Sequence, residues 1–228
     1  GKDLGDILNK ENRKAFNNEF KKEKADLVTA DGGFHHEDIS LEEIDSHKLI
    51  LAEIIMALNC QKIGGCFILK IFDITTEFTC NMIEILCCCY KKIGIFKPLT
   101  SRQASSEKYL ICRDFSIDNS RLKYIVSALE KILEKALEHT DKYIKSNIVV
   151  RNNELEKAIK VYNTTYINEQ IKAIEKGVKY SSDYIQIMYD TLNESTPSDL
   201  SKEKIKELVK KMVEDQTSTA DKFSEKIA

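Results

Sequence analysis

Three short apolar segments, each carrying an ionisable residue at or near one end, constrain this chain more than any other feature. They are ADLVTADGGF (25–34), CFILKIFD (66–73) and SRQASSEKYLIC (101–112). Their ionisable residues are Asp31, Lys70 and Glu107, and each one follows, interrupts or opens an apolar, β-branched run. Open α/β sheets bind ligands at the carboxyl edge of their strands. The pattern therefore predicts that the three charges converge at one edge of one sheet.

Helical periodicity fills the gaps between these segments. Ser40 stands three residues before Glu43, which is a capping-box spacing, and apolar residues follow at helical intervals to about Gln61. Thr75 or Thr76 is expected to cap a second helix. The runs IGIFKPL and KYLICRDF then predict two strands joined by the polar loop TSRQASSE. The order strand, helix, strand, helix, strand, strand predicts the second half of a doubly wound α/β sheet with an antiparallel final strand.

The second half of the chain is predicted to be helical. Seven of the eight glycines lie at or before Gly94, and from about Asp118 apolar residues recur with a 3.6-residue period. Further helices are expected over 153–162, 166–176, 181–192 and 201–214. We therefore expect two parts, with residues 1–117 in the α/β sheet and residues 118–228 in a helical extension.

Composition narrows the classes of function. The chain has 35 Lys and Arg residues against 37 Asp and Glu residues, so a global basic field is excluded and any RNA site must be local. Seven cysteines lie mostly in apolar runs without paired Cys-x-x-Cys spacing, which favours a reducing compartment. The run Cys87–Cys89 is interpreted as buried structural thiols rather than a metal or redox cluster. No segment approaches the roughly 20 apolar residues of a membrane span, so no membrane is expected.

The lysine inside the apolar run CFILKIF needs an explanation. Burial disfavours an ammonium group unless a carboxylate lies nearby, and Asp31 and Glu107 are the available partners of Lys70. A lysine in such surroundings can remove or steer a proton near neutral pH. A structural salt bridge at the sheet edge accounts for the same residues, since structural ion pairs also perturb pKa values. The residues alone leave both interpretations open.

The stretch from Gly5 to Phe115 resembles the FtsJ-type ribose 2'-O-methyltransferases, and most closely the cap-specific mRNA (nucleoside-2'-O-)-methyltransferases that make cap 1. The matching elements are GDILNKENRKAF, ADGGF, IIMALNCQKIGGCFILKIFD and FKPLTSRQASSEKYLIC, in the family's order and spacing. The resemblance implies the carboxyl-terminal part of a Rossmann-like class I methyltransferase domain, followed by a helical tail. It implies S-adenosylmethionine-dependent methylation of the ribose 2'-hydroxyl of a cap-proximal mRNA nucleotide, which converts cap 0 to cap 1.

The same resemblance assigns roles to individual residues. Asp31, Lys70 and Glu107 match the last three members of the family's catalytic Lys-Asp-Lys-Glu tetrad. Lys70 would take the 2'-hydroxyl proton, while Asp31 and Glu107 would hold the lysines and the ribose in place. Asp6 and Ile7 match positions that contact the adenine of S-adenosylmethionine, and Asp31 is also assigned to the donor site. No metal is implied.

A further set of residues is expected to contact the capped RNA. It comprises Ser40, Leu41, Glu42, Lys97, Arg102 and Ser105. Lys97 and Arg102 would meet phosphates, which gives local RNA affinity without a global basic field. Ser105 stands where the family resemblance leads us to expect asparagine, and Gln103 stands where it leads us to expect proline.

The resemblance also places a catalytic lysine and a glycine-rich donor loop upstream of Gly1, so the 228 residues alone are expected to be a weak or inactive methyltransferase. Two alternatives stay open, namely a ribosomal-RNA 2'-O-methyltransferase of the same fold and a non-catalytic module that binds RNA or protein. The GDI and KPLTSR segments resemble the cap enzymes more closely than the ribosomal ones. The expected partners are capped mRNA and a protein bound through the helical tail. Family precedent favours a nuclear location, or the cytoplasm for a virus that replicates there.

Overall fold

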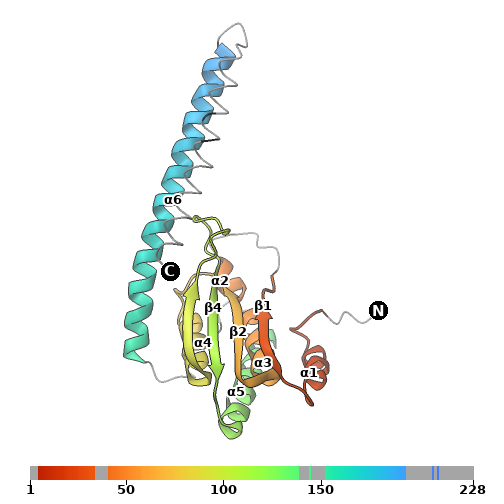
Figure 1. The fold of residues 1–228 in the computed structure, drawn as a ribbon. Helices are drawn as coiled ribbons and strands as arrows, with labels where there is room; N and C mark the ends of the chain where they lie inside the picture. The colour runs from red at the N-terminus through yellow and green to blue at the C-terminus, as the bar shows by residue number, and fades with distance from the viewer. Residues whose placement is uncertain are drawn as a thin grey trace. The chain divides into compact units, whose positions relative to one another are not determined.

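The computed structural model describes residues 5–33, 41–138, 144, 152–193, 207 and 210. The chain divides into two compact units, one formed by Gly1–Lys97 and Ser106–Asn163 and the other by Pro98–Ser105 and Thr164–Ala228. A four-stranded sheet lies at the centre of the first unit (Figure 1). Its strands are β1 (Ala25–Ala30), β2 (Gln61–Ile71), β3 (Tyr90–Phe96) and β4 (Lys108–Phe115).

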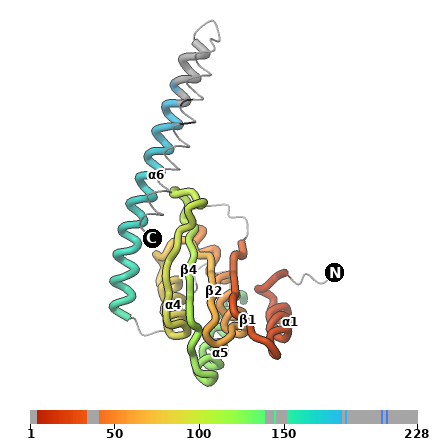
Figure 2. The backbone as a smooth tube through the Cα atoms, in the orientation of Figure 1, coloured from red at the N-terminus to blue at the C-terminus, as the bar shows by residue number. Residues whose placement is uncertain are grey.

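The sheet has the strand order β1-β2-β4-β3, which the tube in Figure 2 lets the reader follow. β1 and β2 are parallel, whereas β4 runs antiparallel to both β2 and β3. This arrangement confirms the predicted α/β sheet with an antiparallel final strand. Because β4 is antiparallel, its amino end lies at the same edge as the carboxyl ends of β1 and β2, with Lys70 opposite Tyr109.

Helices pack against one face of the sheet. The helices of the first unit before residue 139 are α1 (Lys10–Glu19), α2 (Glu42–Asp45), α3 (His47–Cys60), α4 (Glu77–Cys89) and α5 (Asn119–Glu138). α3 contacts β1 and β2, α4 contacts β3, and α5 and α1 both pack on α3. Buried side chains that alternate along β2 and β4, such as Phe67, Leu69 and Leu110, form the core with these helices. The apolar periodicity of α3 and α4 is thereby accounted for.

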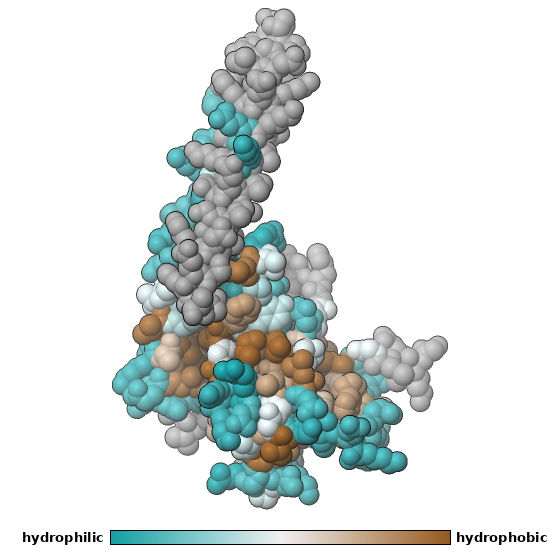
Figure 3. Space-filling view, viewed as in Figure 1, coloured by the Kyte–Doolittle hydropathy of each residue, from teal (hydrophilic) through white to brown (hydrophobic). Residues whose placement is uncertain are grey.

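The other face of the sheet is open among the described residues. It carries Ile68 and Ile111, which are half-buried, and Leu27 and Phe96, which are 56% and 39% exposed. Figure 3 shows the resulting hydrophobic area over the sheet in the view of Figure 1. Because side chains alternate along a strand, this open face is also the one that carries Lys70.

The boundary between α3 and β2 lies close to the expected place. The helix ends at Cys60, next to the predicted Gln61, and Gly64 and Gly65 lie inside β2. The register between β1 and β2 is irregular at this point, and Gly64 has a φ of +81°. Such a left-handed conformation favours glycine because a side chain there is strained. The glycines therefore form a bulge that brings residues 66–69 into register with β1.

The caps of the helices were partly predictable. Thr76 caps α4 as expected, and its hydroxyl oxygen accepts a hydrogen bond from the Thr79 N–H at 3.2 Å. Of the expected capping box, Ser40 lies outside the described residues. The Glu43 carboxylate accepts hydrogen bonds from the Thr75 and Thr76 backbone N–H groups. The helix predicted from Ser40 to Gln61 is divided at Ser46 into α2 and α3.

The helical second half is confirmed where it is described, with one correction. α5 begins after Asp118, whose carboxylate accepts hydrogen bonds from the backbone of Ser120 and Arg121. The three helices expected over 153–162, 166–176 and 181–192 are wrong as separate elements, because α6 runs without interruption over Asn153–Asn193. The Asn-Thr-Thr segment at 163–165 contains neither proline nor glycine, so nothing in it stops a helix. The helix expected over 201–214 lies almost entirely outside the described residues.

Candidate functional site

Three strand ends bring the expected catalytic residues to one edge of the sheet. Asp31 follows β1 directly, Lys70 is the penultimate residue of β2, and Glu107 immediately precedes β4. The Lys70 ammonium lies 2.7 Å from the Asp31 carboxylate and 3.3 Å from the Asp31 carbonyl oxygen. The lysine side chain is 15% exposed and that of Asp31 is 63% exposed. A cation largely withdrawn from water is therefore paired with a carboxylate that still faces solvent.

Tyr109 connects this pair with Glu107, and our sequence reasoning missed it. Its hydroxyl donates a hydrogen bond of 3.4 Å to the Asp31 carboxylate, and its side chain also interacts with the Glu107 carboxylate. Burial together with the charges of Glu107 and Asp31 raises the pKa of Tyr109 to about 12, so the phenol stays protonated at neutral pH. A signal was available, because Tyr109 stands two residues after Glu107 and alternate strand residues share a face.

Glu53 lies beneath the turn that follows β1, and it was also missed. Its carboxylate accepts a hydrogen bond from the Gly32 N–H at 2.8 Å. Burial raises the pKa of Glu53 to about 7, while the Gly32 hydrogen bond and the charge of Lys70 act in the opposite direction. The sequence signal is one acidic residue inside the apolar helical run LILAEIIMAL.

Two further lysines act on the backbone around the site. Lys97, expected to contact RNA, donates a hydrogen bond of 2.7 Å to the carbonyl oxygen of Glu107. Lys108 is 1% exposed and binds the Phe72 carbonyl at 2.9 Å and the Asp73 carboxylate at 3.2 Å. Burial lowers the pKa of Lys108, although Asp73 opposes that effect. Both lysines hold the amino end of β4 in place, with Lys108 tying it to the end of β2.

A buried polar network supports the segment that leaves β2. The Glu43 carboxylate accepts hydrogen bonds from the Thr75 and Thr76 backbone N–H groups and from both threonine hydroxyls. Burial alone raises the pKa of Glu43, but the hydrogen bonds from Thr75, Thr76 and Thr79 together lower it. His47 lies beside this network, 3.1 Å from the Thr76 hydroxyl, and burial lowers its pKa to about 4. The network fixes how the chain turns from β2 into α4.

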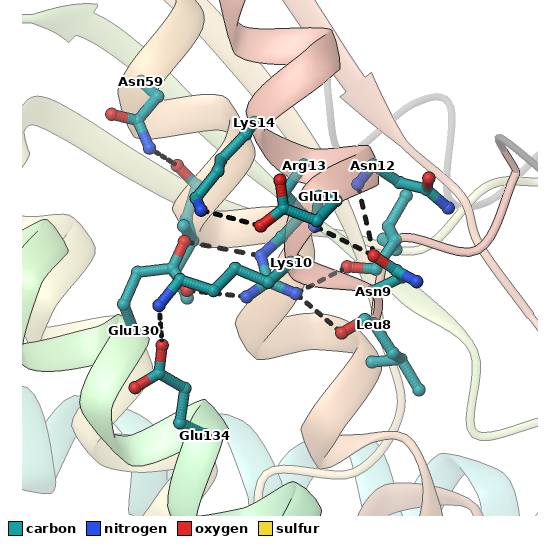
Figure 4. A network of polar contacts seen from close by, with 12 residues as sticks. Leu8, Asn9, Lys10, Glu11, Asn12, Arg13, Lys14, Asn59, Glu130 and Glu134 are labelled. Atoms are coloured by element: carbon teal, nitrogen blue, oxygen red, sulfur yellow. Dashed lines mark hydrogen bonds and ion pairs between the residues drawn. The ribbon is translucent and has the colours of Figure 1, made fainter.

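The turn that carries Asp6 and Ile7 is fixed by a buried arginine. Figure 4 shows the Arg13 guanidinium between the Leu8 carbonyl, 2.8 Å away, and the Glu130 carboxylate, 2.6 Å away. Arg13 also donates to the Ile7 carbonyl at 2.9 Å, and it is only 1% exposed. The Asp6 carboxylate accepts a hydrogen bond from the Leu8 N–H at 2.9 Å and is exposed. α1 and α5 thus hold the turn whose residues were expected to contact adenine.

The residues expected to contact RNA are placed as follows. Glu42 accepts a hydrogen bond of 2.6 Å from the Ser106 hydroxyl, Leu41 is half-buried just before α2, and Ser40 lies outside the described residues. Arg102 and Ser105 belong to the second unit, where the Ser105 N–H donates to the Arg102 carbonyl. The Ser105 carbonyl accepts a hydrogen bond of 2.7 Å from Tyr166 of α6.

The cysteines are all free thiols. The interpretation of Cys87–Cys89 as buried thiols is wrong for Cys87 and Cys88, which are exposed, and holds for Cys89. Within the described ranges, no group of three or more His, Cys, Asp and Glu side chains is arranged to hold a metal ion. The helices described here include none that combines the length and the apolar character needed to cross a membrane.

Comparison with known proteins places this geometry in context. Cap-specific mRNA (nucleoside-2'-O-)-methyltransferase 1 of Mus musculus is 34% identical over 209 residues, covering 87% of this chain and 24% of that protein. The protein of the same name from Homo sapiens is 32% identical with the same coverage. The Xenopus laevis protein of that name is 32% identical over 214 residues, covering 89% of this chain and 24% of the relative. The chain thus spans about a quarter of the length of these curated relatives.

The family described as FtsJ-like methyltransferase matches residues 2–115, which is half of the chain. The matched residues contain the whole four-stranded sheet and the cluster of Asp31, Lys70, Glu107 and Tyr109. The sheet, the cluster and the sequence match thus fall on the same residues, and the chain belongs to the FtsJ-like methyltransferase family.

Proposed function

We propose that the protein containing this chain methylates the ribose 2'-hydroxyl of a cap-proximal mRNA nucleotide, with S-adenosylmethionine as the donor. The observation that carries the proposal is the 2.7 Å ion pair between Lys70 and Asp31 at the ligand-binding edge of a methyltransferase sheet. The names of the relatives support capped mRNA as the acceptor. We assign Asp31, Lys70 and Glu107 as the catalytic residues.

The residues at this edge suit a positively charged donor. The Asp31 carboxylate is more than half exposed although it is paired with Lys70, so it retains a face for a second cationic group. A Cβ atom added at Gly33 would lie 3.5 Å from the Lys70 ammonium, so the glycine leaves space beside this group. Asp31, Asp6 and Ile7 would hold the donor, with the Asp6 carboxylate accepting from the exocyclic amine of adenine.

S-adenosylmethionine supplies an electrophilic methyl group on a sulfonium sulfur. Once its ammonium has released a proton to solvent, the Lys70 Nζ amine would accept the proton of the 2'-hydroxyl while the ribose oxygen takes the methyl group and S-adenosylhomocysteine leaves. The ammonium that results is stabilised by the Asp31 carboxylate 2.7 Å away. Glu107 and Tyr109 orient Asp31 and the ribose, so positioning supplies much of the rate.

We assign RNA binding to the residues that the sequence predicted for this role. Leu41 and Glu42 would contact the cap-proximal nucleotides together with Ser40, while Lys97, Arg102 and Ser105 would meet the RNA backbone. The Lys97 ammonium, which donates a hydrogen bond to the Glu107 carbonyl oxygen, would contact the RNA backbone from that position. Phosphate contacts of this kind orient a nucleic acid without reading its sequence.

Transfer of labelled methyl to four RNA acceptors tests the proposal. The full-length product of the gene and the 228-residue chain are each incubated with labelled S-adenosylmethionine and one RNA sequence. That RNA is prepared uncapped, with cap 0 and with cap 1, and a ribosomal RNA fragment is the fourth acceptor. We expect the full-length protein to label cap 0 RNA only. Labelling of the ribosomal fragment alone would favour the ribosomal enzyme, and a folded protein that labels no acceptor would favour the non-catalytic module.

The cellular location and the protein partner of the helical tail remain predictions. A nuclear location is tested by imaging the tagged full-length protein in its own cells. Exclusion of the tagged protein from the nucleus would contradict it.

A further inference from the structure

An acidic side chain that the proposed chemistry does not use lies directly beneath the candidate site. Glu53 is 7% exposed on α3, in a run of apolar residues that otherwise builds the core. A buried carboxyl is costly unless its position gives it hydrogen bonds or a charged partner. Its presence at this point therefore requires a reason beyond packing.

The contacts of Glu53 point to the turn that carries Asp31. Its Oε1 atom accepts from the Gly32 N–H at 2.8 Å, and the turn fits closely against α3. A Cβ atom at Gly32 would lie 2.6 Å from that same oxygen and 3.3 Å from Leu49, so only glycine allows this approach. The hydrogen bond thus fixes the backbone between Asp31 and Gly33.

The same carboxyl is coupled electrostatically to the catalytic pair. Two charged groups act on Glu53, namely Lys70 from β2 and Asp31 from the turn after β1. Lys70 favours the ionised form of Glu53, whereas Asp31 disfavours it.

We propose that Glu53 is a positioning residue for the methyl transfer: its carboxyl holds Gly32, and thereby sets the Asp31–Lys70 ion pair. This inference rests on the proposed function, because it assigns the pair to catalysis. Glu53 itself touches neither reacting group. Its effect passes through the backbone of the turn and through its charge.

The variants Glu53→Gln and Glu53→Ala separate the hydrogen bond from the charge. Glutamine keeps an oxygen that can accept from Gly32 but cannot ionise, whereas alanine removes the acceptor as well. Glu84→Gln is the matched control, because Glu84 is a buried glutamate of α4 with one oxygen bonded to the Asn152 N–H. All three are made in the full-length gene product.

The first measurement is kcat for methyl transfer to cap 0 RNA across pH 6 to 9. We expect Glu53→Ala to lower kcat about tenfold, since it frees the turn. Glu53→Gln should restore most of the plateau rate. It should also remove the part of the pH dependence that follows the ionisation of Glu53, whose pKa is about 7, because glutamine cannot ionise. Glu84→Gln should match the wild type in rate and in pH dependence.

The second measurement does not depend on activity. Hydrogen–deuterium exchange of the peptide containing residues 31–33, followed by mass spectrometry, reports whether the Gly32 amide is held. We expect faster exchange in Glu53→Ala and unchanged exchange in Glu53→Gln.

The two measurements separate the two proposals. A wild-type protein that methylates no RNA, with exchange as expected, would refute the proposed function and with it the positioning role of Glu53. An active wild type in which both Glu53 variants keep the wild-type rate and pH dependence would overturn the inference alone. Unchanged exchange in Glu53→Ala would do the same.

Discussion

The Tyr109 hydroxyl lies where it can act on both carboxylates of the site. It donates to Asp31 at 3.4 Å and interacts with Glu107, while its raised pKa keeps it a donor at neutral pH. A neutral donor placed between two carboxylates lessens their mutual repulsion and keeps its own proton. Tyr109 thus links the residue that pairs with Lys70 to the residue assigned to the ribose.

Tyr109→Phe removes this link with little change in volume. The loss of one hydrogen-bonding hydroxyl is worth about 1 kcal/mol, so we expect kcat on cap 0 RNA to fall roughly three- to tenfold. The melting temperature should stay close to that of the wild type, because the ring remains. Steady-state methyl transfer measures the effect, and an unchanged kcat would show that the hydroxyl has no part in positioning Asp31.

At the scale of elements, Glu43 joins α2 to the segment between β2 and α4. Its buried carboxylate accepts from two backbone N–H groups, at 2.9 Å from Thr76 and at 3.1 Å from Thr75, and from both hydroxyls. These hydrogen bonds satisfy N–H groups at the start of α4, where a helix also favours negative charge. The direction in which the chain leaves β2 therefore depends on one residue of a neighbouring helix.

Glu43→Gln should lower the free energy of unfolding by roughly 2 kcal/mol at pH 7, because hydrogen bonds to a charged acceptor are replaced by weaker ones. The folded pKa of Glu43 lies below its ordinary value of 4.5. Its ionisation therefore stabilises the fold above that value, and this stability is lost as the pH falls through the lowered pKa. The difference between variant and wild type should accordingly shrink in acid.

Urea unfolding of the chain at pH 7 and in acid, followed by circular dichroism, measures this difference. Glu138→Gln is the control, because Glu138 is exposed at the end of α5. A Glu43→Gln variant as stable as the control at pH 7 would contradict the role given to the carboxylate.

At the scale of the whole molecule, the antiparallel final strand is what assembles the site. Asp31 and Lys70 come from parallel strands and meet at their carboxyl edge, whereas Glu107 reaches that edge because β4 runs the other way. This convergence was predictable, since the apolar segments, their charged ends and the polar loop before KYLICRDF are all local signals.

The roles of Glu53 and Glu43 could not be predicted, because they depend on tertiary contacts that local sequence patterns do not contain. Glu53 was visible as an acid in an apolar helix, but its partner Gly32 is 21 residues away and only the packing of α3 under the turn brings them together. Glu43 was assigned to a local cap because the spacing allowed it, and the competing partners Thr75 and Thr76 lie 32 and 33 residues later. Helix breaks were predicted in α6 at 163–165 and 177–180, although neither segment contains a proline that would stop a helix.

The most direct test of the account is a single-turnover measurement of methyl transfer to cap 0 RNA by the full-length gene product and its Lys70→Ala variant. The RNA is then digested to nucleosides and analysed by mass spectrometry. We predict one methyl group on the ribose 2'-oxygen of a cap-proximal nucleotide for the wild type. For the variant we predict a rate lower by about a hundredfold or more, with S-adenosylhomocysteine binding retained. Methylation of a base, or a Lys70→Ala variant that transfers methyl at the wild-type rate, would contradict the account.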